Sequence, residues 1–129
     1  MSPRKLISSG SPWESLAGYS RAVRVGSRIL VSGTTATHGE GTVVCPGDAE
    51  AQTVYVLDKI GAAIEALAGD MDDVVRTRIY VRDAARAEAV SRVHGRFFGA
   101  VRPANTLVQV GGLVGDGYEV EIEAEAEVA

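Results

Sequence analysis

The feature that most constrains the fold is the end of the chain, EVEIEAEAEV, in which glutamate occupies every second position. The glutamates are Glu119, Glu121, Glu123, Glu125 and Glu127. Successive side chains of a β-strand point to opposite faces, so this spacing puts all of these carboxylates on one face and the intervening apolar residues on the other. The alternation therefore predicts a strand over residues 119–128 with one apolar face and one acidic face.

An acidic strand face needs counter-charges, because like charges on neighbouring positions repel. The stretch DDVVRTRIYVRD supplies them. Its period-two pattern predicts a second strand, in which Val75, Thr77, Ile79 and Val81 point one way and Arg76, Arg78 and Tyr80 the other. We expect Arg76 and Arg78 to be cross-strand partners of the glutamates. The polar face then meets water or another copy of the chain.

The remaining elements follow from periodicity, turn residues and helix caps. Gly26-Ser27 predicts a hairpin turn between two β-branched runs, and residues 34–47 are typical of a loop. Asp48 and Asp83 are expected to cap helices that end near Gly69 and Gly99. Strands are predicted over residues 19–25, 28–33 and 103–110, the last opened by Pro103.

The resulting order is β-β-α-β-α-β-β, which predicts an α+β fold with a mixed sheet and two helices on one face. The opposite face is expected to carry the arginines, Tyr80, the glutamates, Asn105 and Gln109. With 129 residues, the chain is predicted to form a single domain over residues 1–129.

The composition limits the kinds of partner and the cellular compartment that we expect for this chain. The net charge of −4 argues against general affinity for nucleic-acid backbones. The lone cysteine, Cys45, permits no internal disulfide and favours a reducing, cytoplasmic location. No apolar run reaches the length of a membrane span, and the first residues lack the apolar core of a signal peptide.

The spacing of motifs does not by itself indicate a metal site, an activated nucleophile or a phosphate-binding loop. His38 and His94 have no further ligands at metal-binding spacing, so no metal site is expected. Cys45 has no neighbouring His or Lys to activate its thiol. No serine stands in a nucleophile elbow, and no glycine run matches a phosphate-binding loop.

Four stretches, however, stand together in an order that resembles one family. They are AGYSRAVRVGSRILVSGTTA, DDVVRTRIYVRD, HGRFFGAVRPANTLVQV and EVEIEAEA. Over residues 10–128 the chain is identified as a member of the Rid (reactive intermediate deaminase) family, also called YjgF or L-PSP. The resemblance implies a chorismate-mutase-like two-layer sandwich that forms a homotrimer, with the sheets as an inner barrel. It also implies ligand clefts between subunits and hydrolysis of reactive imines and enamines to carbonyl compounds and ammonia, without metal or organic cofactor.

The resemblance also suggests site residues. Glu121 matches the glutamate that positions or activates the hydrolytic water, and Tyr19 matches a conserved tyrosine that would steady the leaving nitrogen. Gly33, at the end of VSG, and Leu107 match positions whose backbone contacts the ligand. Thr106, beside Asn105, is a further candidate for substrate binding, and Glu121 is expected to face the cleft opposite Asn105.

Asn105 marks a departure from the family pattern. The well-known deaminases have Pro-Ala-Arg here, and that arginine clamps the substrate carboxylate, whereas this chain has Pro103-Ala104-Asn105. Charge-assisted hydrogen bonds are worth about 1.5 to 3 kcal/mol, so losing them weakens acid binding. Arg24 or Arg28 are candidates to replace the clamp from elsewhere in the fold.

Three functions follow as hypotheses. The first is hydrolysis of a small imine, enamine or related nitrogenous metabolite at the cleft. The second is a non-catalytic small-ligand binder or stress-related holdase. The third, endoribonuclease activity, is disfavoured by the acidic balance and by the lack of a basic, aromatic strand face.

Overall fold

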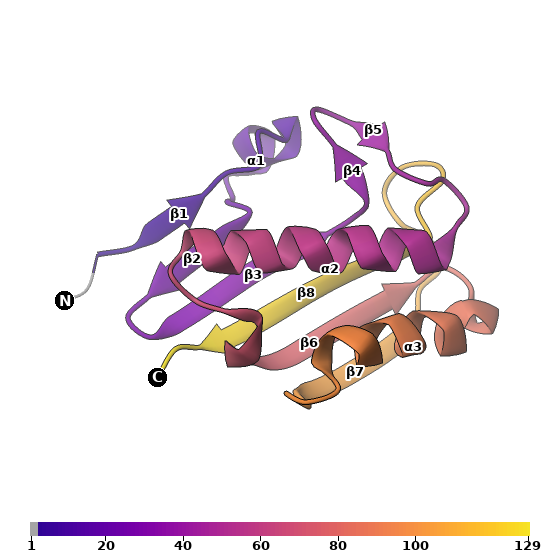
Figure 1. Ribbon diagram of the computed structural model, residues 1–129. Helices are drawn as coiled ribbons and strands as arrows, with labels where there is room; N and C mark the ends of the chain where they lie inside the picture. Colours follow the sequence, from indigo (N-terminus) through magenta and orange to yellow (C-terminus); the bar gives the residue numbers. More distant parts are fainter. Residues whose placement is uncertain (1–2) are drawn as a thin grey trace.

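The computed structural model describes residues 3–129 and is built on one mixed sheet (Figure 1). The sheet has six strands in the order β1-β2-β3-β8-β6-β7, antiparallel except for the parallel pair β6 and β7. The strands are β1 (Lys5–Ile7), β2 (Ala22–Val25), β3 (Arg28–Thr34), β6 (Val74–Val81), β7 (Ala104–Gln109) and β8 (Val120–Glu127). β8, which carries the alternating glutamates, therefore lies between β3 and β6 near the middle of the sheet.

Two long helices cover one face of this sheet (Figure 1). They are α2 (Ala49–Ala66) and α3 (Ala87–Phe98), the second entered through the short 3₁₀ helix η2 (Ala84–Arg86). Asp48 accepts a hydrogen bond from the Ala51 amide at 3.0 Å, and Asp83 accepts one from the Ala85 amide at 3.0 Å. The expected cap of α2 is confirmed, as is the Gly26-Ser27 turn between β2 and β3. Asp83 caps η2, whereas α3 itself begins after Arg86 without a side-chain cap.

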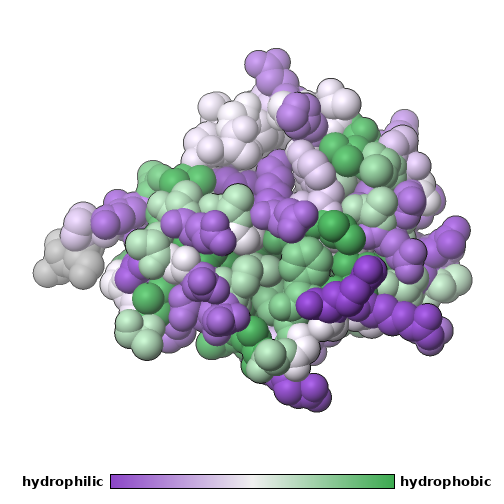
Figure 2. All heavy atoms as spheres, in the orientation of Figure 1, coloured by the Kyte–Doolittle hydropathy of each residue, from purple (hydrophilic) through white to green (hydrophobic). Residues whose placement is uncertain are grey.

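The core fills the space between helices and sheet. Its largest fully buried side chains come from both layers: Ile29, Leu57, Ile60, Ile64, Ile79, Phe98 and Ile122. Outside this core the helix-covered face mixes hydrophilic and hydrophobic side chains, with strongly hydrophilic groups gathered over α3 (Figure 2). The α+β fold with a mixed sheet and two main helices on one face is therefore confirmed.

Several elements were not expected from the sequence. The N-terminal residues form β1 and the short helix α1 (Pro12–Ala17). The presumed loop after β3 holds a small hairpin of β4 (Thr37–His38) and β5 (Thr42–Val43), and the 3₁₀ helix η1 (Met71–Asp73) precedes β6. These elements span only two to six residues, which is too few for a repeated pattern of apolar and polar positions to be recognised.

The register corrects the expected faces of two strands. An irregularity in the β6–β8 pairing between Val74 and Arg76 leaves Val75 exposed and buries Val74 instead. In the parallel pair, Asn105 lies beside Thr77 and Gln109 beside Val81. Neighbours in register point to the same face, so Asn105 and Gln109 lie on the helix side and not on the glutamate face.

No helix within residues 3–129 is both long enough and apolar enough to cross a bilayer.

Candidate functional site

The site forms where β3 is irregular beside β8. Val31 pairs with Ala124 and Thr34 with Ile122, so the stretch between them contains one residue more than its partner strand. This bulge brings Gly33 against Glu121, and a Cβ atom at residue 33 would overlap the Glu121 carboxylate. β-bulges re-aim side chains near sites, and here the missing side chain makes room for a carboxylate.

Glu121 differs from the other alternating glutamates in its partners. Glu119 pairs with Arg82 at 2.8 Å, Glu123 with Arg78 at 3.4 Å, and Glu125 with Arg78 at 3.3 Å. Arg28 reaches Glu125 and Glu127. Among residues 3–129, Glu121 alone of this set makes no ion pair. The expected cross-strand role of Arg78 is confirmed, whereas Arg76 forms no ion pair in the described chain.

Burial changes the acidity of Glu121. Desolvation raises the pKa of its carboxyl above the usual value, and the nearby Glu123 charge raises it further. The positive charge of Arg21 opposes both effects. A carboxyl whose pKa is raised toward neutrality exchanges protons with a substrate more readily than an ordinary surface glutamate does.

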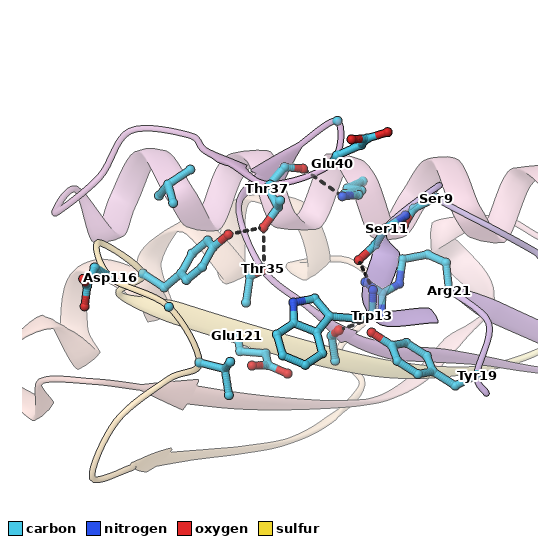
Figure 3. Close-up of a pocket in the computed structure, with 18 residues that line it drawn as sticks. Ser9, Ser11, Trp13, Tyr19, Arg21, Thr35, Thr37, Glu40, Asp116 and Glu121 are labelled. Carbon is cyan, nitrogen blue, oxygen red and sulfur yellow. Dashed lines mark hydrogen bonds between the residues drawn. The ribbon is translucent and has the colours of Figure 1, made fainter. Parts of the chain in front are cut away.

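Glu121 lines a cavity of about 560 Å³ outside the helix-covered core. Trp13 from α1 projects beside Glu121, and Tyr19 from the following segment lies beside Arg21 (Figure 3). Arg21, just before β2, and Lys59, from α2, also line it. A cavity of this size, with apolar rings and a few converging polar groups, has the features of a small-molecule site.

A hydroxyl-rich wall closes the side of the cavity formed by β4. The Thr37 hydroxyl bonds to Tyr118 Oη at 2.6 Å and to Thr35 Oγ1 at 2.8 Å (Figure 3). The Thr37 carbonyl accepts hydrogen bonds from Lys59 Nζ at 2.9 Å and from Tyr55 Oη at 3.3 Å. One residue of a short strand thus ties the hairpin to α2 and to the segment before β8.

Asn105, Thr106 and Leu107 do not line this cavity within the described chain. Asn105 Nδ2 donates to Thr77 Oγ1 at 2.9 Å, and Thr77 bonds to His94 Nε2 at 2.8 Å. Leu107 packs against the core, and Thr106 is exposed on β7. Within one chain Glu121 does not face Asn105, because β7 lies two strands away from β8, which carries Glu121, and Asn105 turns to the helix side. Their meeting across a cleft between subunits stays a prediction.

The arginines suggested as replacement clamps also lie elsewhere. Arg24 Nη1 donates to the carbonyls of Leu67 and Ala68 at the end of α2. Arg28 pairs with glutamates at the far end of β8. Neither lines the cavity.

Sequence reasoning missed Trp13, Arg21 and Lys59. Arg21 carried a usable signal, since residues two apart in an extended segment share a face and Tyr19 was already a candidate. Trp13 and Lys59 carried none, because only the tertiary fold brings α1 and α2 to the same cavity. Across residues 3–129, no three His, Cys, Asp or Glu side chains gather in a metal-binding group.

The two-layer α+β fold has a cavity beside its sheet, lined by Glu121, two further carboxylates, two cations and aromatic rings, and these are features of a small-molecule site. The family model described as endoribonuclease L-PSP matches residues 10–128. The chain thus belongs to the Rid/YjgF/L-PSP family.

Individual relatives agree with this assignment. A crystal structure from Mycobacterium tuberculosis, of a member of the YjgF/YER057c/UK114 family, has 44% identity and a TM-score of 0.88, covering 98% of this chain and 100% of that one. A Rid-family protein of unknown function from Yersinia pestis has 28% identity and a TM-score of 0.85, covering 98% and 100%. A RutC family protein of Pyrococcus abyssi is 33% identical, covering 84% of this chain and 83% of its own length.

Proposed function

We propose that this protein is an enzyme that hydrolyses a reactive imine or enamine to a carbonyl compound and ammonia in the cavity at Glu121. The observation that carries the proposal is Glu121 itself. Its carboxylate has no ion-pair partner in the described chain, lines a cavity large enough for a metabolite, and has a raised pKa. No metal or organic cofactor enters the proposed reaction.

The chemistry needs only a water molecule and one group that moves protons. An enamine first tautomerises to its imine. The water oxygen then forms a bond to the imine carbon while Glu121 takes a proton from the water and passes it to the nitrogen. The resulting carbinolamine expels ammonia as its hydroxyl proton leaves through Glu121 and the nitrogen gains a proton. In this scheme the carboxyl returns to its starting state.

Tyr19 is proposed to hydrogen-bond the nitrogen as it leaves, and the Gly33 backbone to line the place where the water and the substrate meet. Imines hydrolyse readily, so correct placement of substrate and water supplies much of the acceleration. Asn105, Thr106 and Leu107 remain proposed substrate-binding residues only if a neighbouring subunit brings them to the cleft.

A turnover assay tests the proposal. Imino acids are generated in situ by an amino-acid oxidase, and their disappearance is followed with a trapping reagent. We expect the wild-type protein to accelerate the loss and Glu121→Gln to lower kcat by about a hundredfold or more. Glu125→Gln is the matched control, since Glu125 lies on the same face of β8 and pairs with arginines outside the cavity.

The outcomes separate the hypotheses. No acceleration by the wild-type protein, or full activity in Glu121→Gln, would overturn the hydrolase proposal. Saturable ligand binding without turnover would favour the binder. Ribonuclease activity, the third hypothesis, is also tested because the family description names it, and cleavage of single-stranded RNA that survives Glu121→Gln would assign that activity to another surface. A sequence pI of about 5.1 gives such a substrate little electrostatic attraction.

We further propose that the protein acts as a cytoplasmic homotrimer. The open sheet face displays the apolar side chains Leu30 and Val108 beside its ion pairs, and β7 is a largely exposed edge strand. Covering this face and edge with other copies removes apolar surface from water.

A further inference from the structure

We infer that Arg21, supported by Lys59, is the group that binds the carboxylate of an organic-acid ligand in the cavity. The inference rests on the proposed function for the reaction that follows, but the binding site stands on the geometry of the two cations. In the well-known deaminases an arginine at the position of residue 105 binds the substrate carboxylate. We assign that task in this chain to Arg21, because residue 105 is asparagine.

Arg21 is buried yet incompletely paired. The residue is only 8% exposed, and its Nη2 donates to the Gly33 carbonyl at 2.9 Å. Nε is buried and has no hydrogen-bond partner, and Nη1 makes no hydrogen bond to residues 3–129. Leaving a donor of a charged group unpaired is costly, and Nη1, which unlike Nε is not sealed from solvent, is the nitrogen that can meet an incoming acceptor.

The backbone fixes the position of Arg21 before a ligand arrives. Its amide donates to Ile7 O at 2.8 Å and its carbonyl accepts from the Ser32 amide at 2.9 Å, extending the β-ladder. The guanidinium lies 5.7 Å from the centre of the Tyr19 ring. A planar guanidinium held at both ends in this way is preorganised for a carboxylate, which it binds through paired N–H donors.

Lys59 adds a second positive charge to the lining of the cavity, close enough to Arg21 for the two charges to interact. Its Nζ donates to the Thr37 carbonyl, which leaves further N–H donors free. Burial lowers the pKa of Lys59, the Arg21 charge lowers it further, and Glu14 opposes both. Within residues 3–129 no carboxylate lies within ion-pair distance of either cation, although Glu14 and Glu121 are close enough to affect their charges.

An anionic ligand would therefore relieve the repulsion between Arg21 and Lys59. With its carboxylate on the two cations, the adjacent carbon of the ligand would lie toward Glu121, because Arg21 bonds to the carbonyl of Gly33 and Gly33 abuts Glu121. This is the arrangement that a 2-imino acid requires, with the carboxylate one bond from the carbon that water attacks.

Equilibrium binding tests the inference independently of turnover. Trp13 is the sole tryptophan of the chain and lines the cavity, so its fluorescence reports occupancy. The probes are 2-oxobutyrate and its methyl ester, which differ in the charge of the carboxyl group. We expect the wild-type protein to bind the acid more tightly than the ester. Arg21→Gln should weaken acid binding by roughly tenfold to a hundredfold with little change for the ester.

Two further variants keep the test decisive. Lys59→Gln, which retains a donor toward Thr37, should reduce the preference for the acid in the same direction if Arg21→Gln is too unstable to study. Arg28→Gln removes an arginine outside the cavity and should leave the preference unchanged. Equal binding of acid and ester by the wild-type protein, or no binding of either, overturns the inference, as does an unaltered acid preference in Arg21→Gln and Lys59→Gln.

The two proposals fail in different ways. If Glu121→Gln abolishes imine turnover but Arg21 does not affect acid binding, the hydrolase stands and the carboxylate site falls. If acid binding depends on Arg21 but no imine is hydrolysed, the carboxylate site stands and the protein is a binder.

Discussion

At the residue scale, one missing side chain and one unpaired carboxylate define the site. Gly33 lies in the bulge of β3 without a positive φ, so the need for glycine at this position comes from the space that Glu121 occupies and not from the backbone conformation. The other alternating glutamates differ from Glu121, because each of them pairs with an arginine.

Filling the space at residue 33 should displace Glu121. In Gly33→Ala the new methyl group overlaps the carboxylate, so Glu121 must leave its position. We expect imine hydrolysis to fall at least tenfold, because misplacing a reacting group by about 1 Å costs about a hundredfold. Gly41→Ala, in the open part of the cavity rim, is the control and should retain activity. Unchanged kcat in Gly33→Ala would show that the position of Glu121 does not matter.

The raised pKa of Glu121 also predicts a pH dependence of stability. Burial raises this pKa in the folded protein, so between the unfolded value near 4.5 and the folded value the native state binds more protons. Stability contributed by this group is therefore lost as pH rises through that window. Urea unfolding at several pH values should show Glu121→Gln gaining stability relative to wild type as pH rises above about 4.5. Parallel stability curves would contradict the burial of an ionisable carboxyl.

At the scale of elements, the C-terminal end of α2 places an alanine in a backbone conformation that alanine does not favour. The helix ends in a Schellman motif, with the Gly69 amide bonded to Ile64 O and the Ala68 amide to Glu65 O, each at 3.0 Å. Ala68 takes the left-handed position with φ of 63°. Glycine follows one residue later, where a Cβ would overlap Ile29 and Ile64.

Ala68→Gly should therefore stabilise the protein. Glycine adopts the left-handed conformation without a Cβ clash, and we expect the free energy of unfolding to rise by about 0.5 to 1 kcal/mol. Ala62→Gly, exposed within the same helix, should instead lower it by about 1 kcal/mol. Thermal unfolding of both variants checks the opposite signs, and a loss in Ala68→Gly would mean that Ala68 is not strained.

Gln52 of α2 holds the segments that lead into the site. Its buried amide donates to the carbonyls of Val44, Cys45 and Gly117 and accepts from the Glu119 amide at 2.8 Å. Gln52→Leu leaves these groups without partners and should lower the free energy of unfolding by at least about 2 kcal/mol. Asp58→Leu, on the exposed side of α2, is the control. Denaturant unfolding of both proteins gives the comparison.

At the scale of the whole molecule, the open sheet face and the edge strand β7 leave apolar side chains exposed. We propose that other copies of the chain cover them. Light scattering of the purified protein should give a mass three times the 13.5 kDa of one chain. Leu30→Glu, on the exposed face, should shift the mass toward one chain because it places a charge in a proposed apolar contact. A monomeric wild-type protein would leave Asn105, Thr106 and Leu107 outside the site altogether.

The sequence by itself determined the strands β2, β3, β6, β7 and β8, the two main helices and the alternation of β8, because periodicity and turn residues are local properties of the chain. The resemblance of its motifs added the family, and with it Glu121 and Gly33.

Only the tertiary structure decided which glutamate stays unpaired, since that depends on which arginine the neighbouring strands bring within reach. It also turned Asn105 to the helix side, through a parallel register that no single strand specifies. Arg21, Lys59 and Trp13 meet because β2, α2 and α1 converge on the bulge of β3. Such contacts join residues far apart in the chain, and local sequence patterns contain no information on that distance.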